Sequence, residues 1–398
     1  MKFLAALLVI CISSALGDDT ALKEFTSGNN LFTTSIYKEI KKTSPGNFLV
    51  SPFSAESVLA LAQSGAKDET ALEMRNTLHL PDSPEKIQNA IKSIHPQLKQ
   101  SDLYTLKTAN KIYLKTGFEV RDEFKKVASD VFEAGLENID FSKKEEAAQT
   151  MNQWVEDQTE HKIQNLISPG SLNSRTRAIL INALYFKGNW TTPFKKFLTK
   201  NEDFYKNGKQ VAPVPTMNLQ TPNKYYESEE LKAKFLELPF EGGDVSMIFV
   251  LPNEKDGLEA LENQLEKTVE FPKLTEEFVK ISLPKFQIRS QFTLIEMLQE
   301  LGMKKVFKGD EADLSGIAGK KGDLVIDQVV QKTFIDLNED GVEAAAATFV
   351  AVGVPLSGVI TSTSPPKEFK ADHPFLFYIK IKDLILFAGR VVDPTDSK

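Results

Sequence analysis

The segment formed by residues 338–364, NEDGVEAAAATFVAVGVPLSGVITSTS, constrains the fold most, because it has no consistent secondary-structure preference. Its alanines at 344–347 favour helix, whereas Phe349 and the valines that follow favour strand. Gly353 and Pro355 would break any helix soon after its start. A loop of more than about twenty residues without structure of its own is uncommon in a compact domain and is usually functional or disordered. We therefore expect an exposed functional loop near the C-terminus.

The first half of this segment has the side chains of a strand that could enter a sheet. In an extended conformation, Val342, Ala344, Ala346 and Thr348 would share one face. All four are small or β-branched, so they could lie beneath a closed sheet without overpacking it. A piece of ordinary buried helix is the alternative that the alanine run alone favours. The glycines and prolines that follow the run argue against that alternative.

The N-terminal sequence predicts secretion. Residues 1–17, MKFLAALLVICISSALG, combine one lysine, a short apolar run and small residues before a cleavage point, as secretory signals do. The apolar run is too short for a membrane span. The single cysteine, Cys11, lies within this signal. We therefore expect an extracellular mature chain, residues 18–398, that has no disulfides and is held together by its core.

Composition narrows the range of partners. The chain has 48 Lys and Arg residues against 55 Asp and Glu residues, and this mildly acidic balance argues against nucleic acid as the partner. No stretch after the signal is apolar enough to cross a bilayer. Because no linker rich in Pro, Gly or Ser divides residues 18–398, we expect one large domain. We also expect it to be a monomer.

Hydrophobic periodicity predicts an α+β fold, with helices mostly early and sheet mostly late. An amphipathic helix is expected from about residue 20, and a short strand at 48–50. Pro52 then begins a second helix, with Ser51 at its N-cap. Residues 145–167 are predicted as a further helix.

A nearly continuous apolar run at residues 178–186, AILINALYF, predicts a strand that is covered on both faces. Asn182 in the middle of this run needs buried hydrogen-bond partners, which the hydroxyls of Ser51 and Ser54 could supply. Further strands are predicted at 235–238 and 245–251 as a hairpin, at 324–337 leading into the loop, and at 375–381 and 384–392 as a closing hairpin.

No catalytic or metal-binding motif stands out in the sequence. The four histidines lack metal-ligand spacing and no cysteine follows the signal, so neither a metal site nor a cofactor is expected. No GxSxG motif surrounds a serine, and the chain is not expected to be an enzyme. Asn189 begins the one N-glycosylation sequon, in which the bulky Trp190 weakens the signal.

Several motifs, in order along the chain, resemble those of the serpin family. They are NFLVSPFSAESVLALAQSGA at 47–66, INALYFKGNW at 181–190, VPTM at 214–217, LPKF at 283–286, NEDGVEAAAAT at 338–348, ADHPFLFYI at 371–379 and LFAGRVVDP at 386–394. Together they extend over nearly all of the mature sequence. The resemblance implies a serpin fold of three β-sheets with about eight or nine helices and an exposed reactive-centre loop at about 338–366.

The resemblance also implies protease inhibition by a suicide mechanism. In serpins a protease attacks the loop and forms an acyl bond, and the cut loop then inserts as a new central strand of the main sheet. The implied hinge consists of Glu339, Gly341, Val342, Glu343, Ala344, Ala345, Ala346, Ala347 and Thr348. The implied polar shutter beneath the opening sheet consists of Ser51, Ser54, Asn182 and Gln331. Many family members have His where this chain has Gln331, so the shutter would lack a titrating group.

The family spacing, counted from Gly341, places the cut after Pro355, which is a poor site for most serine proteases. The sequence PLS instead favours Leu356 as the recognised residue and Ser357 as the residue after the cut. Val354 and Val359 remain alternatives for the recognised residue.

The absence of Lys and Arg between Lys332 and Lys367 disfavours trypsin-like targets. The expected partner is a secreted serine protease of elastase-, chymotrypsin- or subtilisin-like specificity, with a cysteine protease as an alternative. A non-inhibitory serpin that acts as carrier, chaperone or storage protein is the second hypothesis, although such members usually have bulky, charged or proline residues in the hinge. A secreted storage or binding protein, in which the loop is only a flexible connection, is the third.

Overall fold

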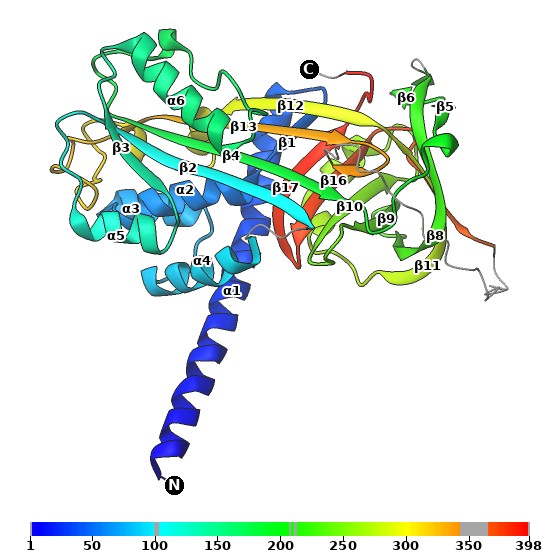
Figure 1. Cartoon of the computed structure of the whole chain (residues 1–398), viewed down its shortest axis with the longest axis horizontal. Coiled ribbons are helices and arrows are strands. Elements are labelled where there is room, and N and C mark those ends of the chain that lie inside the picture. The colour runs from blue at the N-terminus through cyan, green and yellow to red at the C-terminus, as the bar shows by residue number, and fades with distance from the viewer. Residues whose placement is uncertain (1, 99–102, 207, 211–212, 343–364, 397–398) are drawn as a thin grey trace.

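The computed structural model describes residues 2–98, 103–206, 208–210, 213–342 and 365–396, with side chains from Thr20 onward. Within these ranges the chain forms nine α-helices and three β-sheets (Figure 1). The predicted α+β class and the expected numbers of sheets and helices are confirmed.

Most of the helices precede the late strands, as the sequence predicts. Their bounds are α1 Lys2–Thr43, α2 Pro52–Ser64, α3 Asp68–Thr77, α4 Pro84–Leu98, α5 Asp122–Asp130, α6 Lys144–Gln158, α7 Leu258–Glu262, α8 Leu265–Val269 and α9 Ile295–Glu300. The backbone continues α1 through the predicted signal, and the N-terminal part of this helix extends away from the rest of the molecule in Figure 1.

The predicted helix at residues 145–167 is too long, because α6 ends at Gln158. Glu160, His161 and Asn165 all have positive φ, which an α-helix does not allow. The hydroxyl of Thr159 donates to the carbonyl of Val155 at 2.7 Å and accepts from a later backbone N–H, so it replaces the next turn of helix with a local side-chain contact.

The first sheet, here called the main sheet, has six strands in the order β12-β13-β14-β4-β2-β3. Their bounds are Phe286–Thr293, Ile326–Leu337, Gly341–Val342, Ala178–Asn189, Tyr104–Lys115 and Gly135–Ile139, in the same order. β13 and β4 are parallel and pair directly from Ile326 and Ala178 to Phe334 and Tyr185. We call the line along which these two strands meet the seam.

The second sheet has nine strands and carries both predicted hairpins. Its order is β1 Phe48–Val50, β17 Leu384–Val391, β16 Phe375–Ile381, β10 Val245–Pro252, β9 Ala233–Pro239, β8 Val214–Ser228, β11 Thr275–Pro284 and β15 Lys367–Lys370, with β5 Lys200–Glu202 paired to β8. The β9–β10 and β16–β17 pairs are antiparallel, as predicted. β6 Tyr205–Lys206 and β7 Lys209–Gln210 form the small third sheet.

Strand β4 is covered on both faces, as its apolar run predicts. Ile179, Ile181 and Ala183 pack in one cluster with Met151 and Val155 of α6. The alternate residues, including Leu180 and Leu184, belong to the larger core on the α2 side of the sheet. Because successive strand residues point to opposite faces, Asn182 lies on the α2 side.

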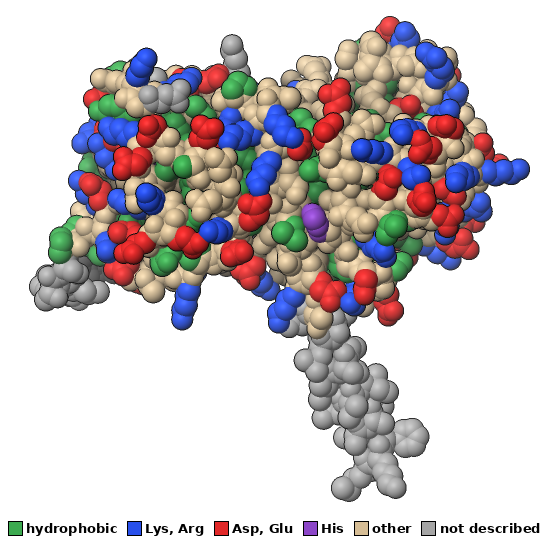
Figure 2. Space-filling model, turned by 180° about the vertical axis from the view of Figure 1, so that it is seen from behind, with side chains coloured by type: hydrophobic (Ala, Val, Ile, Leu, Met, Phe, Trp, Pro, Cys, Tyr) green, Lys and Arg blue, Asp and Glu red, His purple; other side chains and the backbone are tan. Residues whose placement is uncertain are grey.

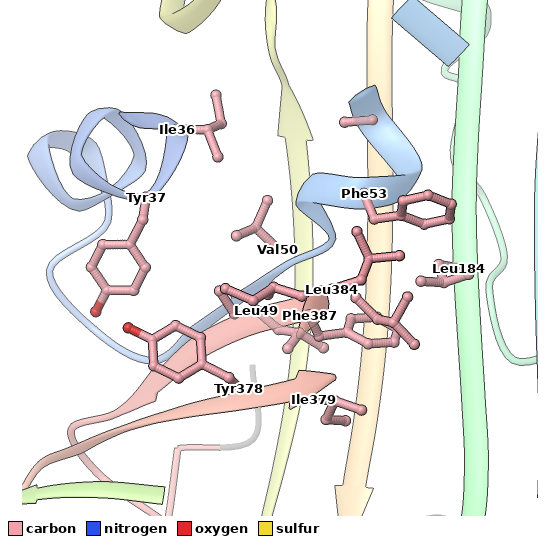
Figure 3. Close-up of a cluster of buried hydrophobic side chains, with 14 of the residues drawn as sticks. Ile36, Tyr37, Leu49, Val50, Phe53, Leu184, Tyr378, Ile379, Leu384 and Phe387 are labelled. Atoms are coloured by element: carbon pink, nitrogen blue, oxygen red, sulfur yellow. The ribbon is translucent and has the colours of Figure 1, made fainter. Parts of the chain in front are cut away.

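The main core joins α1 to both large sheets. Figure 3 shows Ile36 and Tyr37 of α1 beside Leu49 and Val50 of β1, with Tyr378 and Phe387 of the β16–β17 hairpin beneath them. Phe53 at the start of α2 lies close to Leu184 of β4 in the same cluster. The first turn of α2 is therefore held between the two sheets.

The surface mixes both signs of charge. Figure 2 shows Lys and Arg interspersed with Asp and Glu over one face of the molecule, without an extended area of a single sign. Among the described helices, none combines the length and the apolar character that a membrane span requires.

Candidate functional site

Three amide side chains form a buried row across the middle of the main sheet. Asn110 of β2 and Gln331 of β13 both lie in register with Asn182 of β4. The Nδ2 of Asn182 donates to Asn110 Oδ1 at 2.6 Å, and the Nε2 of Gln331 donates to Asn182 Oδ1 at 2.6 Å. Asn182 and Gln331 are fully buried, so each amide depends on the others for its hydrogen bonds.

The first turn of α2 completes this arrangement from one face of the sheet. The backbone N–H of Ser51 donates to Gln331 Oε1 at 2.8 Å, and its carbonyl accepts from Gln331 Nε2 at 2.8 Å. The hydroxyl of Ser54 accepts a hydrogen bond from Asn182 Nδ2. We call Ser51, Ser54, Asn110, Asn182 and Gln331 the shutter cluster.

Ser51 differs from its prediction in two ways. Its hydroxyl donates to the carbonyl of Leu386 at 2.8 Å rather than to Asn182. For the same reason, Ser51 occupies the N-cap position of α2 without capping the helix through its side chain. The hydroxyl thus ties the helix start to β17, and only its backbone contacts the amide row.

Asn110 was missed by sequence reasoning, although the sequence contains a signal for it. The alternate residues Leu106, Ile112 and Leu114 of β2 are buried in the main core. Asn110 shares their face, because it lies an even number of residues from each of them. A single amide on an apolar strand face indicates a buried polar partner, as it does for Asn182.

One hydrogen bond of the shutter cluster crosses the seam. The bond between Gln331 and Asn182 crosses from β13 to β4, where any new central strand would have to enter. Separating these strands without new partners would leave buried amides unsatisfied, at a cost of about 1–3 kcal/mol for each group. The cluster contains no titratable side chain, so its hydrogen bonds do not depend on pH.

We call residues 338–342 the loop stem, and they lie at one end of the seam. After β13 ends at Leu337, residues 338–341 form a tight turn in which the N–H of Asn338 donates to the carbonyl of Gly341 at 2.9 Å. Strand β14 then enters between β13 and β4, where Val342 pairs with both Leu337 and Gly188. Val342 is 1% exposed, so the first residue of the predicted inward face is already buried in the seam.

Gly341 fits this position because it has no side chain. A Cβ at residue 341 would lie 2.0 Å from the carbonyl oxygen of Gly188, and the φ of Gly341 is +152°. A Cβ at Gly188 would in turn lie 2.8 Å from the ring of Phe186. The backbones of β14 and β4 can therefore approach each other only with glycine at position 341. A side chain at position 188 would instead meet the rings of Phe186 and Phe240.

Glu339 anchors the stem by an ion pair. Its side chain is 7% exposed and accepts from Lys285 Nζ at 2.9 Å and from the Thr199 hydroxyl at 2.8 Å. Its carbonyl accepts from the backbone N–H of Phe194 at 2.9 Å. Burial raises the pKa of Glu339, but the hydrogen bonds from Lys285, the backbone and Thr199 outweigh burial and hold the pKa below its ordinary value.

Trp190 fixes the other side of the stem. Its ring stacks on Phe240 with centroids 4.5 Å apart, its Nε1 donates to the carbonyl of Asn338 at 3.1 Å, and its backbone N–H donates to Asp340 at 2.9 Å. Asn189, the residue of the sequon, pairs with Gly341, and its Nδ2 donates to Glu241 at 3.2 Å. Glycosylation of Asn189 stays a prediction.

The rest of the predicted loop lies outside the described residues. This applies to Glu343, Ala344, Ala345, Ala346, Ala347 and Thr348 of the hinge and to Val354, Pro355, Leu356, Ser357 and Val359 around the cut. In the part of the chain that the structure does describe, no group of three His, Cys, Asp or Glu side chains gathers as metal ligands would.

Comparison with known proteins gives consistent matches over nearly the full length. A family model described as Serpin (serine protease inhibitor) matches residues 27–394. Antichymotrypsin-2 of Bombyx mori is 37% identical, covering 91% of this chain and 96% of its own length. Leukocyte elastase inhibitor of Homo sapiens is 36% identical over 94% of this chain and 100% of its own length. The crystal structure of Serpin48 of Tenebrio molitor, described as a highly specific serpin, superposes with a TM-score of 0.86 at 52% identity, covering 93% of this chain and 98% of that one.

Proposed function

We propose, from the premise that this chain belongs to the serpin family, that it is a secreted suicide-type protease inhibitor. In this proposal a serine endopeptidase attacks the loop and forms an acyl bond with it. The cut loop then enters the seam as a new strand and carries the protease with it, which leaves the protease trapped as a covalent complex.

The observation that carries the proposal is the position of the loop stem. Strand β14 already lies between β13 and β4 at one end of the seam, and its Val342 is buried there. The alternate residues that follow, Ala344, Ala346 and Thr348, are small enough to continue the same strand along the seam. A loop with this stem and these side chains is suited to insertion.

We assign roles to the residues on this basis. Residues 339–348 act as the hinge, which moves into the sheet first. The shutter cluster, including Asn110, holds β13 and β4 together until insertion separates them. No step in this mechanism requires a metal or a cofactor, because the reacting nucleophile belongs to the protease.

For the target, we propose a protease of elastase-, chymotrypsin- or subtilisin-like specificity, with Leu356 as the recognised residue and Ser357 after the cut. The loop between Lys332 and Lys367 contains no basic residue for a trypsin-like protease to recognise. The names of two relatives, antichymotrypsin-2 and leukocyte elastase inhibitor, agree with an apolar residue at this position. A cysteine protease remains the alternative partner.

Denaturing gels test inhibition directly. The mature chain is incubated with pancreatic elastase, chymotrypsin and subtilisin, and a band at the summed mass that survives boiling in detergent is expected with at least one of them. Cleavage of the loop by every protease, without such a band, would instead place the protein among carrier or storage serpins.

The substitution Leu356→Arg tests the position of the cut. We expect it to redirect covalent complex formation to trypsin and to weaken it toward the original target, because the recognised side chain then carries a positive charge. The control is Val359→Arg, which should leave the specificity unchanged. If Val359→Arg redirects the inhibitor and Leu356→Arg does not, the recognised residue is Val359. Mass measurement of the released C-terminal fragment identifies the bond independently.

A further inference from the structure

We propose that an exposed turn beside the loop stem makes a second contact with the target protease before cleavage. The turn comprises Lys195, Lys196, Phe197, Leu198 and Lys200, and we call it the basic aromatic turn. It includes the 3₁₀ helix η2, Lys196–Leu198. This inference rests on the proposed function, because the partner it names is the protease bound to the loop.

Phe197 is the most exposed of the large hydrophobic side chains that the structure describes, at 80%, and its neighbour Leu198 is 43% exposed. Phe194, three residues earlier, is buried at 3%. The chain therefore leaves the core within one turn and presents an aromatic ring to solvent. Exposed aromatic rings are enriched at protein interfaces, where they fill pockets on the partner.

The turn is fixed rather than loosely attached. The N–H of Leu198 donates to the carbonyl of Lys195 at 2.8 Å, and Asn218 Nδ2 donates to the carbonyl of Leu198 at 3.3 Å. The hydroxyl of the next residue, Thr199, donates a hydrogen bond to Glu339 of the loop stem. A contact on a fixed turn loses little conformational entropy when a partner binds.

The turn is also positively charged. The Nζ of Lys195 lies 5.9 Å from the centroid of the Phe197 ring. Among the described residues, no carboxylate lies close enough to Lys195 to form an ion pair, whereas Lys196 and Lys200 each have one. Lys196 pairs with Asp340 at 2.9 Å and Lys200 pairs with Glu202 at 3.5 Å, but their side chains are 62% and 70% exposed, so both are only partly neutralised. The complementary surface would be a shallow apolar depression bordered by acidic side chains.

The place of the turn in the fold favours the protease over other occupants. Lys196 of the turn and the adjacent Thr199 contact Asp340 and Glu339, which lie at the start of the loop expected at about 338–366. In this proposal a protease bound to the loop reaches the turn, because the turn is attached to the stem from which the loop starts. Complexes between proteases and inhibitors bury about 800 Å² on each partner, so contacts beside the loop are expected in addition to the loop itself. After insertion the protease moves away from the stem, and the contact acts only during docking.

The test compares association rates of Phe197→Ala and Lys195→Glu with those of the wild type. The probes are whichever of pancreatic elastase, chymotrypsin and subtilisin the wild type traps. With the protease whose association rate changes most, we expect Phe197→Ala to lower the second-order association rate constant about tenfold. An effect of this size is typical of an aromatic residue at the centre of an interface. Lys195→Glu should lower it several-fold at low ionic strength, with the difference shrinking as salt is added.

The number of inhibitor molecules consumed per trapped protease should stay at the wild-type value, because neither change touches the loop. The matched controls are Leu72→Ala and Lys126→Glu, on α3 and α5 at the opposite end of the main sheet in Figure 1, which should leave the rate unchanged. Thermal melting of each variant confirms that it is folded.

The outcomes separate this inference from the proposed function. If the wild type traps a protease but Phe197→Ala and Lys195→Glu keep the wild-type rate with every protease trapped, the docking contact is wrong and inhibition stands. If the wild type sediments as a dimer that Phe197→Ala dissociates, the turn binds a second copy and the inference is also wrong. If all three proteases cleave the loop of the wild type and none is trapped, both proposals fail.

Discussion

Alternate side chains along the first half of the loop determine how easily the segment can become a strand of the main sheet. Val342 is already buried at the end of the seam. The side chains of Ala344, Ala346 and Thr348 would point to the same face in a continued strand. Each must then fit above the core on the α2 side of the sheet, where small apolar groups are tolerated and charges are not.

In the proposed mechanism, replacing Ala346 with Arg should convert the chain from an inhibitor into a substrate. The guanidinium would have to be buried without a partner as the strand enters, so insertion would slow and the protease would complete hydrolysis first. We expect cleaved protein to increase at the expense of covalent complex on denaturing gels. Thr361→Arg, beyond the predicted cut, is the control and should keep the wild-type ratio. Equal complex formation by Ala346→Arg would contradict the assignment of the inward face.

Glu339 makes the attachment of the loop stem dependent on pH. Its native pKa is lowered, so its ion pair with Lys285 stabilises the folded chain above the unfolded pKa of about 4.3. This contribution is lost as the pH falls through the lower, native pKa. Because Lys285 is 37% exposed, solvent screening limits the contribution to about 1 kcal/mol or less.

Thermal melting between about pH 3 and pH 7 measures this linkage. Near neutral pH the wild type should have a higher melting temperature than Glu339→Gln. The difference between the two melting temperatures should shrink as the pH falls and the Glu339 carboxylate is protonated. Lys285→Met removes the same ion pair from the other side and should flatten the pH dependence in the same way. A difference between wild type and Glu339→Gln that grows toward low pH would contradict this account.

At the scale of elements, the shutter cluster couples three strands of the main sheet to the first turn of α2. Asn182 occupies its centre, with hydrogen bonds to Asn110, Ser54 and Gln331. Ser54 and Gln331 are fully buried, and Asn110 is 8% exposed. Removing the central amide therefore affects more than one hydrogen bond.

Asn182→Ala should destabilise the intact protein by about 3 kcal/mol, because it leaves several buried polar groups without partners. Chemical denaturation followed by circular dichroism measures the change. Asn223→Ala is the matched control: this amide on β8 is partly exposed and donates only to the carbonyl of Thr221 at 3.4 Å, so its loss should cost less than about 0.5 kcal/mol. Equal costs for the two changes would show that the cluster does not hold the seam.

The sequence predicts helices and strands well where one hydrophobic pattern dominates a segment. The apolar run of β4 and the two hairpins of the second sheet are confirmed. The end of α6 was missed, because its termination depends on positive φ at Glu160 and His161, which neither residue type requires. The pattern of apolar residues indicates which side chains are buried. A positive φ at residues such as Glu160 and His161 depends instead on tertiary contacts.

Sequence patterns predicted only some of the contacts in the candidate site. Asn182 stands out as an amide within an apolar strand, and Ser54 is its partner as expected. The register that aligns Asn110 and Gln331 with it depends on pairing between strands far apart in the sequence. The contacts of Glu339 with Lys285 and Thr199 likewise join separate regions, and no local pattern indicates them.

At the scale of the whole molecule, the intact chain has a main sheet that could accept one more strand. Insertion of the loop would add on the order of ten ladder hydrogen bonds, at a net gain of about 1 kcal/mol each. The total of about 10 kcal/mol is comparable with the entire stability of an ordinary domain, which is about 5–15 kcal/mol. The intact form would then persist because a barrier separates it from the inserted form, and opening the closed seam would be a part of that barrier.

The melting temperature of the loop-cleaved protein is therefore the most general test. With an unfolding entropy of about 2 cal/mol/K per residue, a gain of about 10 kcal/mol raises the melting temperature of a chain of this length by about 10 °C or more. The measurement compares intact and loop-cleaved protein by circular dichroism, after cleavage by a protease that is not trapped. Cleaved Ala346→Arg is the control, because a loop that is cut but cannot insert should gain much less. If the cleaved wild type melts no higher than the intact chain, the loop does not enter the sheet. The stem in the seam would then be only a docking point for a flexible connection.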